Sequence, residues 1–153
     1  MRIWLGVLLL IIGIPHSLAI DVQKTDSATV IIFTVDKDEK IGIGSGFFVT
    51  EKGHVLTNAH VVEDEGIDKI FIRGKSISEA SLARKVWVVP EHDVAVLLAE
   101  KPSHVAPLKL LSGNVLKGVN VWALGYPSKQ LDNMDVFGES YEELDATLTN
   151  GIV

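Results

Sequence analysis

The chain has 153 residues, enough for one ordinary domain, or for one domain and part of another. It carries 14 Lys and Arg against 20 Asp and Glu, for a formal net charge of −6, and this acidic balance argues against a nucleic-acid partner. It contains no cysteine, which excludes thiol catalysis, disulfide bonds and Cys-ligated zinc or iron–sulfur sites.

The N-terminus has the pattern of a secretory signal peptide over residues 1–19. A basic start at Arg2 is followed by an apolar run from Trp4 to Ile14 and then by Pro15. Ser17 and Ala19 are small residues at the two positions that a signal peptidase reads. A membrane span needs about 20 apolar residues. An uncleaved anchor, as in a membrane-anchored sensor, is therefore the weaker alternative, and we expect a secreted or periplasmic protein.

Beyond residue 19 the chain predicts short β-strands separated by turns. The expected strands are residues 29–35, 47–50, 55–57, 69–73, 81–89, 94–99, 119–124 and 147–153. The run at 94–99 is wholly apolar, which predicts burial on both faces. Residues 59–63 fit one helical turn capped by Asn58 or Thr57. This pattern predicts an all-β barrel or sandwich rather than βαβ units.

Two residues in this β framework suggest catalysis. His60 follows one predicted strand, and Asp93 opens another. Imidazole is the side chain suited to take a serine hydroxyl proton near neutral pH, and a buried carboxylate that accepts its Nδ1–H holds it in one tautomer. Taken singly, such a histidine is usually a satisfied core residue and such an aspartate a turn or cap residue. Their joint occurrence in this order favours a catalytic pair.

The blocks around these residues resemble the trypsin-like serine proteases, most closely the bacterial HtrA/Deg-type branch. The likeness covers about residues 28–153. It rests on the segments Gly44–Val49, Gly53–Val62, Asp93–Leu97, Gly118–Pro127 and Thr147–Val153.

The resemblance implies two six-stranded antiparallel β-barrels with the active site between them. Residues 20–111 would form the first barrel, which carries His60 as general base and Asp93 as its orienting acid. Residues 112–153 would begin an incomplete second barrel. No Gly-x-Ser-Gly-Gly or Gly-x-Ser-x-Gly pattern occurs, so we expect the nucleophilic serine beyond Val153 and an inactive 153-residue chain.

The function implied is that of an exported serine endopeptidase, a cofactor-free hydrolase of protein or peptide substrates. The alternative is a non-catalytic, protease-like binding module, since the chain shows no nucleophile. Neither interpretation requires a metal, a nucleic acid or a stable membrane span after signal cleavage.

Three other candidate sites are weaker. Ser45 lies between two glycines but lacks the spacing of a nucleophile elbow, so we expect the glycines to allow tight strand packing or a bulge. A zinc site built from His54, His60, His92 and Asp93 lacks the His-Glu-x-x-His spacing. His54 is instead expected to face outward from a hairpin.

The segment 131–145 holds six acidic residues and no Lys or Arg, and we interpret it as an exposed acidic loop. A calcium loop beginning at Asn133 is disfavoured because Leu144 stands where the twelfth-position glutamate is needed.

The signal-peptide interpretation predicts cleavage after Ala19. N-terminal sequencing of the exported protein should then begin at Ile20, whereas a mature protein that retains Met1 would contradict cleavage.

Overall fold

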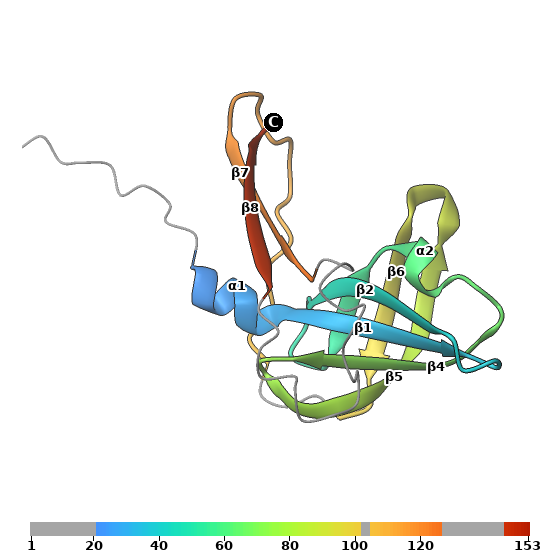
Figure 1. The fold of residues 1–153 in the computed structure, drawn as a ribbon. Coiled ribbons are helices and arrows are strands. Elements are labelled where there is room, and N and C mark those ends of the chain that lie inside the picture. Colours follow the sequence, from blue (N-terminus) through green and yellow to red (C-terminus); the bar gives the residue numbers. More distant parts are fainter. Residues whose placement is uncertain (1–20, 102–104, 127–145) are drawn as a thin grey trace, which may run out of the picture.

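A closed six-stranded β-barrel dominates the computed structural model, which describes residues 21–101, 105–126 and 146–153. A short helix precedes the barrel and a two-stranded sheet follows it (Figure 1). The elements are α1 (Val22–Ala28), β1 (Thr29–Asp36), β2 (Ile41–Phe48), β3 (His54–Thr57), α2 (Ala59–Val62), β4 (Ile67–Gly74), β5 (Ile77–Val89), the 3-10 helix η1 (Pro90–His92), β6 (Val94–Ala99), β7 (Asn120–Gly125) and β8 (Thr147–Ile152).

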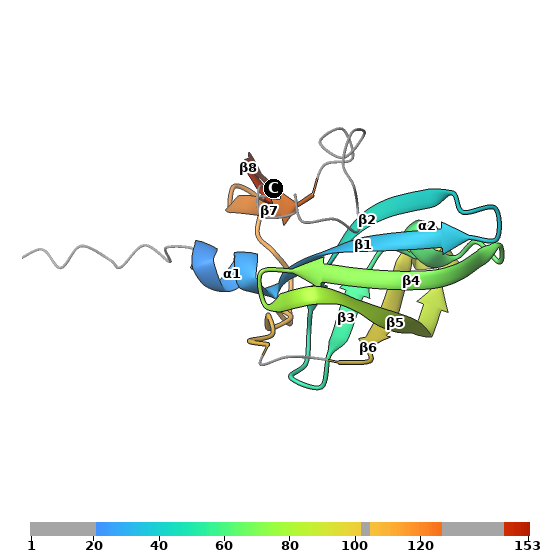
Figure 2. The same ribbon diagram turned by 60° about the horizontal axis from the view of Figure 1, so that its bottom comes forward.

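The barrel closes because β4 returns to pair with β1. The strand order is β1-β2-β3-β6-β5-β4, and every pair is antiparallel (Figure 2). Closure leaves no unpaired edge in this part of the chain. The pairing of β3 with β6 joins strands that are far apart in sequence, with Thr57 opposite Ala95. The residues that follow β3 therefore lie beside those that precede β6. The predicted all-β, six-stranded barrel is confirmed.

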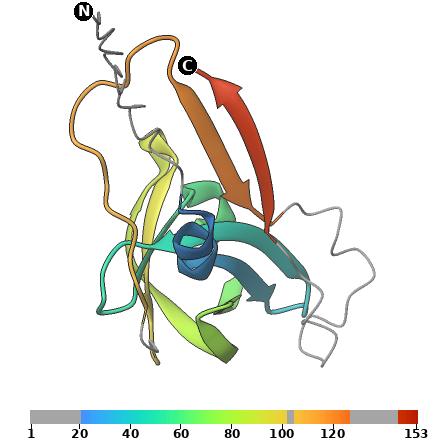
Figure 3. The same ribbon diagram turned by 90° about the vertical axis from the view of Figure 1, so that its left-hand side faces the viewer.

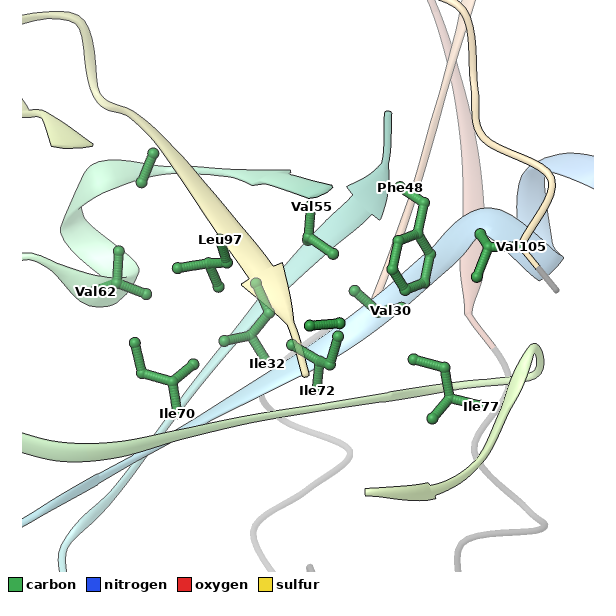
Figure 4. Packing of buried hydrophobic residues seen from close by; sticks show 12 residues of the cluster. Val30, Ile32, Phe48, Val55, Val62, Ile70, Ile72, Ile77, Leu97 and Val105 are labelled. Atoms are coloured by element: carbon green, nitrogen blue, oxygen red, sulfur yellow. The ribbon is translucent and has the colours of Figure 1, made fainter. Parts of the chain in front are cut away.

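The interior of the barrel is filled by aliphatic side chains and one phenylalanine (Figure 4). The cluster is Val30, Ile32, Phe48, Val55, Val62, Ile70, Ile72, Ile77, Ala95, Leu97, Ala99 and Val105. Without disulfides, this burial of apolar surface is the main source of stability.

The expectation that residues 94–99 are buried on both faces is wrong. Ala95, Leu97 and Ala99 are buried, whereas the alternate residues of β6 are only partly covered, because one face of this strand looks outward. The strand buried on both faces is β1. Its outer residues Ile31 and Phe33 pack with Tyr126 in a second small cluster.

Strand β2 begins at Ile41, six residues before the predicted start. Three alternating glycines hide its periodicity. Gly44 is needed for close approach, because a Cβ there would lie 2.5 Å from Cγ1 of Val61 in α2. Tight strand packing, one of the two roles expected for the glycines beside Ser45, is found at Gly46, where a Cβ would lie 2.8 Å from the main-chain oxygen of Leu56 in β3.

Helix α1 was not predicted, and α2 lies where one helical turn was expected. The N-cap of α1 is Asp21, whose carboxylate accepts the main-chain N–H of Lys24 at 3.0 Å. The sequence signal for α1 is weak because only Ala28 of this helix is buried.

Strands β7 and β8 pair with each other and project from the barrel (Figure 3). Several of their apolar residues are exposed, among them Trp122 (48%) and Ile152 (74%), whereas Leu124 and Leu148 are partly buried. The boundary between residues 111 and 112 stays a prediction.

Several sequence predictions lie outside the described residues. These are the signal peptide, the acidic segment and the disfavoured calcium loop. Within the described ranges, no helix is long and apolar enough to cross a membrane.

Replacing Gly44 with alanine should lower the free energy of unfolding by about 1–3 kcal/mol, because the new Cβ must displace Val61. Urea unfolding measures this loss. Gly151→Ala is the matched control, since its Cβ would meet only Cγ2 of Val121, at 3.8 Å. Equal midpoints for the wild type and the Gly44 variant would contradict the packing argument.

Candidate active site

The barrel places His60 and Asp93 together at one end of the β3–β6 pair. His60 is the second residue of α2, which begins two residues after β3 ends. Asp93 lies between η1 and β6 in a left-handed conformation, with φ 50° and ψ 46°. Such a conformation is uncommon for a residue other than glycine, although aspartate tolerates it better than most residues.

The imidazole of His60 lies directly against the carboxylate of Asp93. Nδ1 of His60 is 2.9 Å from both Oδ1 and Oδ2 of Asp93. The main-chain N–H of His60 also donates to Oδ1 at 3.0 Å. Because an ionised carboxylate only accepts hydrogen bonds, Nδ1 must carry the proton. Nε2 of the neutral ring is then an acceptor, and it has no hydrogen-bond partner among the described residues.

A third residue, Asn58, joins the pair. Its Nδ2 donates to Oδ2 of Asp93 at 3.0 Å and to the Asp93 main-chain oxygen at 3.2 Å. Sequence reasoning missed this role and considered Asn58 only as a helix cap. The side chain makes no capping hydrogen bond in the structure. The available signal was an amide side chain two residues before the candidate base.

These hydrogen bonds hold the pKa of Asp93 below its ordinary value. The largest cause is the main-chain N–H of His60, followed by smaller contributions from the His60 side chain and from Asn58; desolvation opposes the shift. The sequence-based expectation that Asp93 is buried is wrong for the described structure, because its side chain is 47% exposed. Three polar donors, rather than burial in the barrel wall, set its environment.

Two cavities flank the pair. His60 lines one of about 330 Å³, together with Asp36, Lys40 and Asp64. Asp93 and Asn58 line another of about 300 Å³, which Leu124 of β7 also borders. The side chain of His60 is itself 65% exposed, so a reacting group could approach it.

The other candidate residues have different partners. The Oγ of Ser45 accepts the main-chain N–H of Tyr126 at 2.8 Å, so it joins the barrel to the end of β7. Nδ1 of His54 lies 2.8 Å from Oγ1 of Thr50, which makes His54 part of its own hairpin rather than simply outward-facing. His92 is the last residue of η1. No group of three or more His, Asp or Glu suited to a metal ion occurs within the described ranges.

A comparison with known families identifies the family of this chain. The family described as "Trypsin-like peptidase domain" matches residues 44–153, which include His60 and Asp93. The chain belongs to this family. The match also includes β7 and β8, so both described sheets contribute to it.

Relatives of this trypsin-like chain carry protease names. "Protease Do-like 1, chloroplastic" from Arabidopsis thaliana is 32% identical over 124 residues, or 79% of this chain and 24% of the relative. "Probable periplasmic serine endoprotease DegP-like" from Pseudomonas fulva is 38% identical over 90 residues, or 58% of this chain and 18% of the relative.

Solved structures share the fold. The serine endoprotease from Yersinia pestis superimposes with a TM-score of 0.64 and 26% identity, and the match covers 86% of this chain and 42% of that one. This chain thus spans a quarter or less of these two curated relatives and under half of the solved protease.

A carboxyl ¹³C NMR titration should give Asp93 a pKa below the ordinary 3.8. Because the pKa is lowered in the folded state, the ionised carboxylate stabilises the fold above that pH, and this contribution is lost as the pH falls through the folded-state pKa.

The variant His60→Ala should raise the pKa of Asp93 only part of the way towards its ordinary value, because the main-chain N–H of residue 60 still donates to the carboxylate. An unshifted Asp93 in the wild type, or complete reversal in the variant, would contradict the assigned causes.

Proposed function

We propose that this chain provides the general base and the orienting acid of an exported serine endopeptidase. The observation that supports this most strongly is the contact of 2.9 Å between Nδ1 of His60 and the carboxylate of Asp93, with Nε2 left as an acceptor. A structural ion pair does not require an Nε2 that is left to accept a proton, whereas a general base does.

In this proposal, Nε2 of His60 takes the proton from a serine hydroxyl as the oxygen attacks the peptide carbonyl. The same nitrogen then donates that proton to the leaving amine. Asp93 holds the ring in the Nδ1–H tautomer and stabilises the imidazolium that forms, without itself becoming protonated. No cofactor enters this scheme.

The serine itself is proposed to lie outside residues 1–153. Ser45, the serine that tempts assignment as a nucleophile, is bound to Tyr126 instead. The curated relatives are much longer than the matched region, which leaves room for a nucleophile and for the donors of an oxyanion hole.

The substrates we propose are proteins or peptides, and the location is the periplasm or the cell exterior. The Pseudomonas relative is named as a periplasmic serine endoprotease, which supports both the substrate class and the location. The signal-peptide pattern of residues 1–19 supports export independently. The competing proposal is a non-catalytic binding module of the same fold, and the following test distinguishes the two.

A fluorophosphonate probe should label a serine in the full-length gene product that contains this sequence. Asp93→Asn should lower the rate of labelling by about 10⁴-fold, because it removes the control of the His60 tautomer, and His60→Ala should lower it by about 10⁶-fold, because it removes the base.

The exposed residue Asn114 supplies a control variant, Asn114→Ala, which should label like the wild type. Folded full-length protein that resists labelling would overturn the protease proposal and favour the binding module.

A further inference from the structure

At the start of α2, Asp93 rather than the N-cap residue Asn58 accepts the hydrogen bond from the first helical turn. Asn58 is the N-cap residue of α2, with extended φ of −79° and ψ of 148°. A side chain here ordinarily accepts an N–H from the first turn of its own helix. In this structure, the N–H of His60 in that turn donates instead to Oδ1 of Asp93, which lies 33 residues further along the chain.

The amide of Asn58 is consequently available for another task. Asp93 presents two acceptors to it, Oδ2 and the main-chain oxygen, and Nδ2 reaches both. An Asn side chain has two N–H donors on one nitrogen, so both contacts can form at once. The amide thereby holds the carboxylate and the left-handed backbone of Asp93 together.

The hydrogen bonds from Asn58 matter because the Asp93 side chain is exposed. With its side chain 47% exposed, Asp93 has no tight shell of packed atoms to fix the rotation of its carboxylate. Hydrogen bonds must do so, and they come from only two residues within the described ranges. His60 supplies the group to be oriented and a main-chain N–H, and Asn58 supplies the remaining side-chain donor.

We infer that Asn58 is a positioning residue, whose amide fixes the Asp93 carboxylate so that His60 keeps its proton on Nδ1 and leaves Nε2 free. The inference deepens the proposed function and rests on it for its catalytic meaning. The hydrogen-bond arrangement itself does not depend on the presence of a nucleophile. Asn58 acts through Asp93 and is not assigned a contact with substrate.

A simple capping role predicts a different response to substitution. Aspartate is isosteric with asparagine and caps helices equally well. If Asn58 served α2 as a cap, Asn58→Asp would be harmless. If its amide holds Asp93, the same change replaces a donor with a second carboxylate, which repels the first.

The test uses ¹⁵N-histidine-labelled protein at neutral pH. Imidazole ¹⁵N shifts report the ratio of the Nδ1–H to the Nε2–H tautomer of His60. We expect both Asn58→Asp and Asn58→Ala to lower this ratio by about fivefold or more, because a hydrogen bond to a charged group is lost.

Three controls accompany the test. Asn114→Asp introduces the same charge at an exposed loop residue and should leave the ratio unchanged. His54, held by Thr50, serves as an internal reference in every sample. Asn58 is itself exposed, so its variants should fold, and far-ultraviolet circular dichroism verifies this.

An unchanged His60 ratio in the folded Asn58 variants would overturn the inference, as would an equal change in the Asn114 variant. Failure of the protease proposal is separate. If the wild type has the Nδ1–H tautomer and both Asn58 variants lose it, the positioning role stands even where a serine probe finds no nucleophile.

Discussion

The arrangement depends on one exposed carboxylate that accepts hydrogen bonds from three groups. The side chain and the main chain of His60 approach Asp93 from one element, and the amide of Asn58 approaches from the residue just before that element. All three favour the ionised form, which explains the direction of the pKa shift without burial. This carboxylate in turn decides which nitrogen of His60 is left as an acceptor.

Barrel closure is what brings these groups together. Asn58 and His60 follow β3, Asp93 precedes β6, and those strands are hydrogen-bonded neighbours although the site residues are 33 or more positions apart. The close approach of α2 to β2 requires Gly44, because any side chain there would meet Val61. The packing of the barrel and the geometry of the candidate site are therefore coupled through one short helix.

The barrel strands and the pairing of His60 with Asp93 could be predicted from the sequence. Residues 94–99 and 29–35 are β-branched and apolar enough to indicate strands, and the blocks around His60 and Asp93 indicated both the family and the pair. The start of β2 was missed because glycines carry no hydrophobic signal. The role of Asn58 was missed because its partner is set by strand pairing, which local patterns do not specify. Burial of Asp93 was overestimated because the carboxylate of such a pair was expected to be buried, whereas hydrogen bonds hold this one at the surface.

The central claim is that Asp93 holds a proton on Nδ1 of His60, and ¹H–¹⁵N correlation spectroscopy observes that proton directly. The account predicts a downfield Nδ1–H signal in the wild type that disappears in Asp93→Ala while the spectrum of the barrel persists. A neutral His60 protonated on Nε2 in the wild type, or an Nδ1–H signal that survives the loss of Asp93, would contradict it.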